Sequence, residues 1–209
     1  MVHKLLEDRP YSFTEIFNLN IPSADLVPAL GYKFERQLLK FPDLPTVDVT
    51  RLEQEFNAVL PYVDLNNEQA RRETLVSSVV KFLVMSIQCR LTFEYGIGSE
   101  RFYGNVDYFL QHENRLVVVE AKRNDLDNGF NQLAAQLATL DQGDYVDAAQ
   151  TVLTGFVTTG VLWLVVQLYR QSKTIVLSLR NYTVPEDLKE LLPLLLQALN
   201  PQNTLSSAE

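Results

Sequence analysis

Two strand-like segments joined by a short polar turn constrain the fold of this chain more than any other feature. The first segment is Arg101–Leu110 and the second is Arg115–Arg123. The residues between them, Gln111–Asn114, are polar and suit a hairpin turn. A hairpin makes the two segments antiparallel neighbours, so the chain is expected to contain a β-sheet that includes both of them.

Charged residues lie near the ends of these two segments. Side chains alternate faces along a strand, so Glu120 and Lys122 point the same way while Ala121 points the other way. The hairpin is expected to bring Asp107 beside the face of Glu120 and Lys122. Two carboxylates and an ammonium group at one end of a sheet form a site for a hard divalent cation, Mg²⁺ or Mn²⁺, and an activated water. In the alternative interpretation, Glu120 and Lys122 form a solvated ion pair that contributes little to stability.

The rest of the chain predicts further helices and strands around this hairpin. The expected elements are a helix at about 68–89, a strand at 91–95, a helix at about 130–141, strands at 152–158, 163–167 and 174–178, and a C-terminal helix opened by Pro185. At the N-terminus, Tyr11–Phe17 and Tyr32–Leu38 alternate apolar and polar residues and are expected to be strands. This order predicts an α/β fold, a sandwich with a central mixed β-sheet and helices covering its faces.

A length of 209 residues is enough for one domain with a sizeable core. We expect three parts within it: an N-terminal extension at 1–65 packed on the core, the core itself at 66–200, and a polar tail at 201–209.

Two of the predicted helices carry polar residues that bear on the cation site. In the helix at 68–89, Glu73 has helical spacing to Val76 and Val80 and is expected on the buried face. An unpaired carboxylate is rare at a buried position. A helix register shifted by one position would instead expose Glu73. In the helix at 130–141, Gln132 and Gln136 are four residues apart and point roughly together, although such glutamines more often face solvent.

These residues, in this order, resemble the PD-(D/E)XK nuclease superfamily. The similarity covers roughly residues 66–180 and includes the helix with Glu73, then Asp107, the triplet Glu120–Lys122, and the helix with Gln132. The family pattern has a proline directly before the aspartate, whereas this chain has valine there. The resemblance implies a restriction-endonuclease-like fold, a three-layer sandwich around a central mixed β-sheet.

The resemblance also implies the metal ligands. Asp107 and Glu120 would ligate Mg²⁺ with help from the Ala121 carbonyl, and Glu73 would be an additional ligand, directly or through water.

It further implies three assisting residues. Lys122 would orient the attacking water or stabilise the negative phosphate. Gln132, with Gln136 as a second candidate, would contact that water or the nucleic-acid backbone.

Composition limits the other functions open to the chain. A net charge of −8 argues against nucleic-acid binding, but residues 71–123 carry eight Lys and Arg against six Asp and Glu. Only His3 and His112 are available, so a histidine-based nuclease or a Ser–His–Asp hydrolase is poorly supported. The single Cys89 excludes an internal disulfide, and no apolar run is long enough to cross a bilayer, so a cytoplasmic location is expected.

These observations favour a Mg²⁺-dependent endonuclease or exonuclease acting on DNA, and by analogy a homodimer that reaches both strands. The alternative is a nuclease-like fold kept as a non-catalytic module for DNA binding or protein interaction, which the acidic net charge favours. A third interpretation, acid/base catalysis by paired carboxylates as in glycoside hydrolysis, is disfavoured by the lysine two residues after Glu120.

Overall fold

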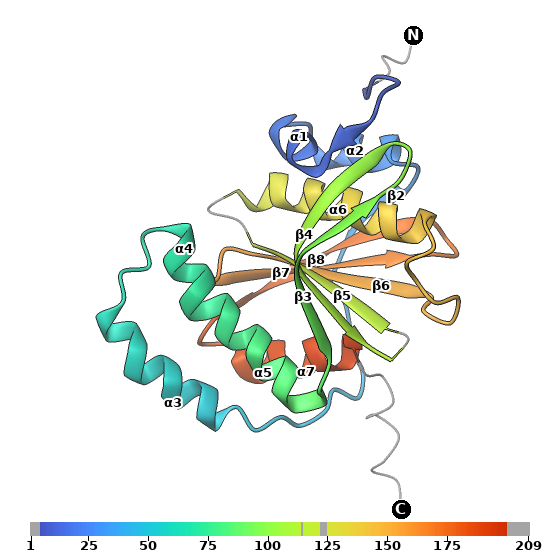
Figure 1. Cartoon of the computed structure of the whole chain (residues 1–209). Helices are drawn as coiled ribbons and strands as arrows, with labels where there is room; N and C mark the ends of the chain where they lie inside the picture. The colour runs from blue at the N-terminus through green and yellow to red at the C-terminus, as the bar shows by residue number, and fades with distance from the viewer. Residues whose placement is uncertain (1–4, 114, 122–124, 200–209) are drawn as a thin grey trace, which may run out of the picture.

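Eight strands form one mixed sheet in the part of the chain that the computed structural model describes, residues 5–113, 115–121 and 125–199 (Figure 1). They are β1 (Tyr11–Ser12), β2 (Lys33–Gln37), β3 (Arg90–Gly98), β4 (Phe102–His112), β5 (Arg115–Ala121), β6 (Val152–Thr158), β7 (Leu162–Tyr169) and β8 (Thr174–Thr183). Their order is β1-β4-β5-β6-β7-β8-β2, with β3 paired to β4. The pairs β1/β4, β5/β6 and β2/β8 are parallel and the others are antiparallel. The predicted mixed α/β architecture is confirmed.

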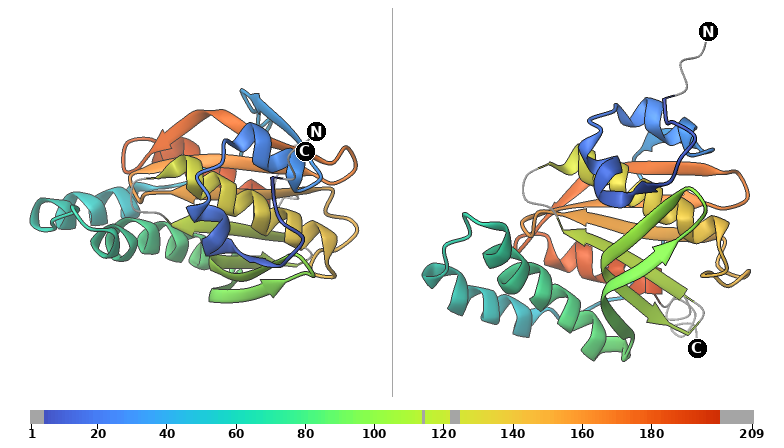
Figure 2. Two further views of the ribbon diagram at one scale, coloured as in Figure 1. Left: turned by 90° about the horizontal axis from the view of Figure 1, so that it is seen from above. Right: turned by 45° about the horizontal axis from the view of Figure 1, so that its top comes forward.

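Helices cover both faces of this sheet (Figures 1 and 2). One face carries the α6 layer, made of α1 (Phe13–Asn18), α2 (Ser23–Ala29) and α6 (Leu126–Gln142). The other face carries the α7 layer, made of α3 (Thr50–Val59), α5 (Ser77–Ile87) and α7 (Leu188–Leu199). Between α3 and α5 lie η1 (Leu60–Tyr62), the short α4 (Glu68–Arg71) and a π-helical turn, η2 (Arg72–Val76). Within the described residues, none of these helices has the length and apolar composition needed to cross a membrane.

The apolar run in β5 reflects burial on both sides. Val118 packs in the core cluster of the α6 layer, whereas Val117 and Val119 pack in the cluster of the α7 layer. A strand covered by helices on both faces needs apolar residues at every position rather than at alternate ones. The same alternation directs Glu120, two residues after Val118, toward the α6 layer.

The N-terminal segment corrects one sequence prediction. Tyr11–Phe17 was expected to be a strand, but β1 ends at Ser12 and α1 follows directly. The Ser12 hydroxyl accepts a hydrogen bond from the Glu15 backbone N–H at 3.1 Å, and the Glu15 carboxylate accepts one from the Ser12 N–H at 2.7 Å. This reciprocal capping box starts a helix and outweighs the short apolar alternation. The strand expected at Tyr32–Leu38 is present as β2.

A buried carboxylate fastens the end of α6 to the sheet. Asp141 accepts hydrogen bonds from Tyr32 Oη at 2.6 Å, Arg170 Nε at 2.8 Å and Lys173 Nζ at 2.7 Å. Burial by itself raises the pKa of Asp141, but the bonds from Lys173, Tyr32 and Arg170 together hold that pKa below its ordinary value. The network ties α6 to the residues that flank β2, β7 and β8.

Candidate functional site

The hairpin predicted from the sequence is present, and its two strands stop pairing just before Asp107 and Glu120. β4 and β5 pair in antiparallel fashion, and Tyr108 opposite Val119 is the pair nearest the open end. Asp107 and Glu120 are the next residues on the two strands, so their side chains start from neighbouring backbone positions. Further along, the first two residues of β4 pair with β1 instead. The acids therefore lie where the two strands diverge.

Glu120 is held by two glutamines of α6. Its carboxylate is buried, with 1% of the residue exposed. Gln132 Nε2 donates to Glu120 Oε1 at 2.6 Å, and Gln136 Nε2 donates to Oε2 at 2.7 Å and approaches the carbonyl oxygen of Asn105 at 3.3 Å. The prediction that the two glutamines point together is confirmed, and the alternative that they face solvent is wrong. One turn of α6 thus fixes the orientation of the carboxylate.

The side-chain oxygens of Gln132 and Gln136 have an unusual environment. The Oε1 atoms of Gln132 and Gln136 are buried and have no hydrogen-bond partner among the described residues. An unsatisfied buried acceptor costs about 1–3 kcal/mol, so native proteins seldom keep one without an ordered water, an ion or a function. Exchanging the nitrogen and oxygen of either amide would place an acceptor against the Glu120 carboxylate and would not remove this cost. The cluster therefore offers oxygen atoms to a water or a cation.

Asp107 lies at a kink that β3 and β4 share. Their ladder keeps one register throughout but omits the pair formed by Glu94 and Asp107. Glu94 has a φ of 49°, in the left-handed region. Tyr108 packs with the α7 layer whereas Val106 packs with the α6 layer, although regular alternation would put both on one face. Side chains of β4 therefore change faces at Asp107.

Arg72 approaches this kink from η2. Its Nη2 lies 3.7 Å from Asp107 Oδ1 and 3.6 Å from Glu94 Oε1. Its guanidinium carbon is 5.6 Å from the centre of the Tyr108 ring. The sequence alone favours a solvated helix face for Arg71 and Arg72, with phosphate contact as the alternative if their helix borders the cleft, and it does not predict the approach of Arg72 to Asp107. Arg72 thus contacts Asp107 from the helical side.

Glu73 is exposed, so the prediction that it lies on the buried face of its helix is wrong. The helix is not a regular α-helix at this point, because η2 is a π-helical turn. A π turn holds more residues than an α turn and shifts the register of the residues before it. Glu73 lines an open pocket together with Arg72 and Tyr108. It therefore lies near the partners of Asp107, outside the core.

The structure says little about two of the predicted site residues, Lys122 and Ala121. Lys122 lies outside the described residues, and Ala121 ends β5 opposite Thr158 of β6. Among the residues that the structure describes, no three Asp, Glu, His or Cys side chains gather as a metal-binding group. The roles of Lys122 and of the Ala121 carbonyl stay predictions.

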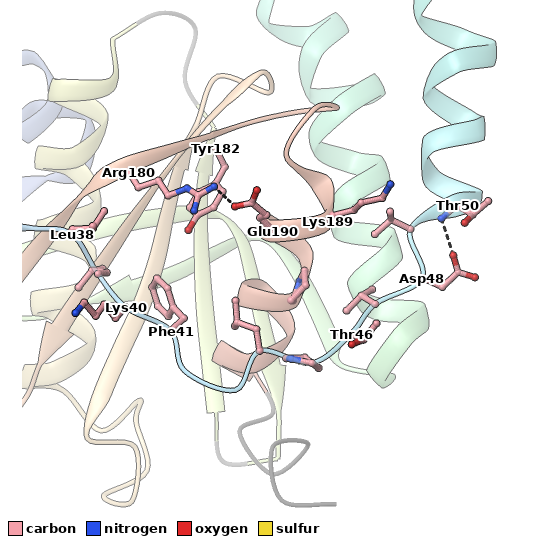
Figure 3. Close-up of a pocket in the computed structure, with 16 residues that line it drawn as sticks. Leu38, Lys40, Phe41, Thr46, Asp48, Thr50, Arg180, Tyr182, Lys189 and Glu190 are labelled. Atoms are coloured by element: carbon pink, nitrogen blue, oxygen red, sulfur yellow. Dashed lines mark hydrogen bonds and ion pairs between the residues drawn. The ribbon is translucent and has the colours of Figure 1, made fainter. Parts of the chain in front are cut away.

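A separate pocket lies between the extended segment 38–50, β8 and the start of α7 (Figure 3). Its volume is about 570 Å³. Arg180 packs over the Tyr182 ring and pairs with Glu190 at its wall. None of the described site residues predicted from the sequence lines this pocket.

In comparisons with known proteins, no protein-family model and no curated protein sequence matches this chain. The resemblance stated above therefore depends on the residues themselves and on the order of the elements.

Proposed function

We propose that this chain is a metal-dependent nuclease of the PD-(D/E)XK type, with a restriction-endonuclease-like core, that hydrolyses phosphodiester bonds of DNA. The observation that carries the proposal is the environment of Glu120. A buried carboxylate is costly, yet here it is oriented by Gln132 and Gln136 at a strand end, next to Asp107 on the neighbouring strand. Two unsatisfied buried acceptors beside a buried carboxylate call for a water, an ion or a function.

The oxygen atoms of this cluster suit a hard divalent cation. The residues that would hold Mg²⁺ or Mn²⁺ are Asp107 and Glu120, and the orphaned Oε1 atoms of Gln132 and Gln136 add oxygen donors of the type that such ions and their waters prefer. When bound, the ion would supply an activated water and offset charge that develops on the phosphate. The Ala121 carbonyl and Glu73 remain the additional ligands that the resemblance implies.

The chain's own residues have separate tasks in this proposal. Gln132 and Gln136 hold the Glu120 carboxylate in one orientation, so that little reorganisation is needed when substrate binds. Arg72 partly offsets the charge of Asp107 and of the substrate phosphate. Lys122 orients the attacking water or stabilises the negative phosphate.

The test uses purified protein, supercoiled and linear DNA, and Mg²⁺ or Mn²⁺. We expect nicking or degradation by the wild type, and loss of it in Asp107→Asn, Glu120→Gln and Lys122→Ala. Glu186→Gln, which changes an acid outside the cluster, is the matched control and should cleave like the wild type. Cleavage that persists in all three site variants would come from a contaminant and would refute the proposal.

One observation favours a second candidate, a non-catalytic module of the same fold. The chain carries a net charge of −8, which disfavours contact with a phosphate backbone. This candidate predicts no cleavage of any nucleic acid and no Mn²⁺ binding by calorimetry. Mn²⁺ binding that Asp107→Asn abolishes would exclude it.

A further inference from the structure

A pocket between the helices of residues 68–81 and the β3–β4 edge lies directly beside Asp107. Its volume is about 610 Å³, within the range of about 300–1,000 Å³ typical of ligand sites. Arg72, Ser77 and Lys81 line it from the helical side, and Phe93 and Tyr108 line it from the sheet. Glu68 and Glu73 also line it, so the lining combines cationic, acidic, hydroxyl and aromatic groups.

Phe93 is the distinctive residue of this pocket. It lies on β3 opposite Tyr108 and is 59% exposed, although Tyr108 itself is buried. The two rings meet edge to face, with centroids 5.5 Å apart and planes at 65°. Tyr108 thus supports one edge of the Phe93 ring, and the pocket leaves much of the ring surface accessible. A supported and exposed aromatic ring suits a flat ligand that can stack on it.

The pocket is connected to the candidate active site through one residue. Arg72 contacts Asp107 at 3.7 Å and also lines the pocket. The π-helical turn η2 begins at Arg72, so the irregularity of the helix coincides with this connection. A group seated between Phe93 and Arg72 would have its neighbouring phosphate next to Asp107.

We propose that this pocket seats one unpaired nucleotide of single-stranded DNA, with its base against Phe93 and its phosphate toward Arg72 and Lys81. The inference rests on the proposed nuclease function and names its substrate class. Base–aromatic stacking tolerates any sequence, because every base has a π-face. A base inside a duplex is already stacked and cannot offer that face to Phe93.

The charges of the pocket also favour a single strand over a duplex. Glu68 and Glu73 line it along with Arg72 and Lys81, so the lining has no net charge. The whole chain is acidic, at −8. Duplex DNA presents about one negative charge per 1.7 Å of its axis, a denser array that such a surface repels more strongly. Stacking on Phe93 would therefore provide much of the affinity.

The experiment measures binding without cleavage. Fluorescence anisotropy in EDTA and low salt would compare a labelled twelve-nucleotide oligothymidylate with a duplex of the same length. We expect Phe93→Ala to weaken single-strand binding about tenfold to a hundredfold, as loss of one base stack does. Phe93→Trp should retain binding, and Lys81→Gln should lower the salt-dependence slope by about 0.7. Leu179→Ala, which truncates a side chain that is 62% exposed on β8, is the control and should bind like the wild type.

Three results would overturn the inference: no single-strand binding by the wild type, unchanged binding by Phe93→Ala, or an equal loss of duplex binding in that variant. Urea unfolding followed by circular dichroism checks that each variant is folded. The two proposals fail separately. Phe93-dependent binding without any metal-dependent cleavage would refute the nuclease and leave this pocket as a single-strand site. Cleavage that Phe93→Ala leaves intact, with intact binding, would refute the pocket alone.

Discussion

Replacing Asp141 by asparagine tests the account of how α6 is anchored. The side chain of Asp141 is 2% exposed, and its two oxygens accept three hydrogen bonds. A hydrogen bond to a charged group contributes about 1.5–3 kcal/mol. Asparagine keeps one acceptor oxygen but turns a donor toward Arg170 or Lys173. The side chain of Lys173 is 53% exposed, so its share is reduced by solvent. The expected loss in the free energy of unfolding is about 2–3 kcal/mol.

The loss of stability caused by Asp141→Asn should also depend on pH, and it should become smaller as the pH falls. The folded-state pKa of Asp141 lies below its ordinary value, because three donors outweigh burial. The stabilisation is therefore complete above the ordinary aspartate pKa and is lost as pH falls through the lowered folded-state pKa. The stability gap between wild type and Asp141→Asn should be largest at neutral pH and should narrow in acid.

Urea denaturation followed by the fluorescence of Trp163, the single tryptophan, measures this gap at each pH. The melting temperature should fall by about 4–12 °C at neutral pH, the range expected for a chain of this size. Asp144→Asn changes an exposed acid in the turn after α6 and is the control. A gap below about 0.5 kcal/mol, the size of an ordinary surface change, or a gap that stays constant into acid, would refute the reasoning.

Three further predictions concern the fold. Ser12→Ala removes the cap of α1 and should cost about 1 kcal/mol by thermal unfolding, whereas the exposed Thr14→Ala should cost clearly less; equal costs would contradict the capping assignment. Gly155→Ala would place a Cβ 2.8 Å from Leu133 Cδ1 and should cost about 1–3 kcal/mol in urea, so an unchanged midpoint would show that α6 and β6 are not in close contact. Burial raises the pKa of the Cys89 thiol, so Cys89 should react with a thiol reagent only after unfolding, and rapid reaction of the native protein would count against its buried position.

Much of the sheet could be predicted because its strands are bounded by clear signals. The polar turn between two strand-like segments identified the hairpin, and the four-residue spacing of Gln132 and Gln136 identified their common direction. These are local patterns, and the structure preserves them. The capping box at Ser12 was an equally local signal, and its spacing to Glu15 could have identified α1 in place of a strand.

The arrangement around Asp107 could not be predicted in the same way. Strict alternation along β4 puts Val106 and Tyr108 on one face, and nothing in the local sequence marks the change of face between them. The π-helical turn that exposes Glu73 is also invisible to a spacing rule based on 3.6 residues per turn. The contact between Arg72 and Asp107 could not be predicted, because both irregularities meet beside it.

The shared kink of β3 and β4 has a consequence for how this hairpin can vary. Glu94 and Asp107 deviate at the same rung, so an insertion or deletion in one strand alone would leave the two deviations at different rungs. Matched length changes, or changes in the loop between the strands, therefore keep the two deviations at one rung. A homologue in which one strand has grown by a residue should show the compensating residue in its neighbour, or a β-bulge that absorbs it.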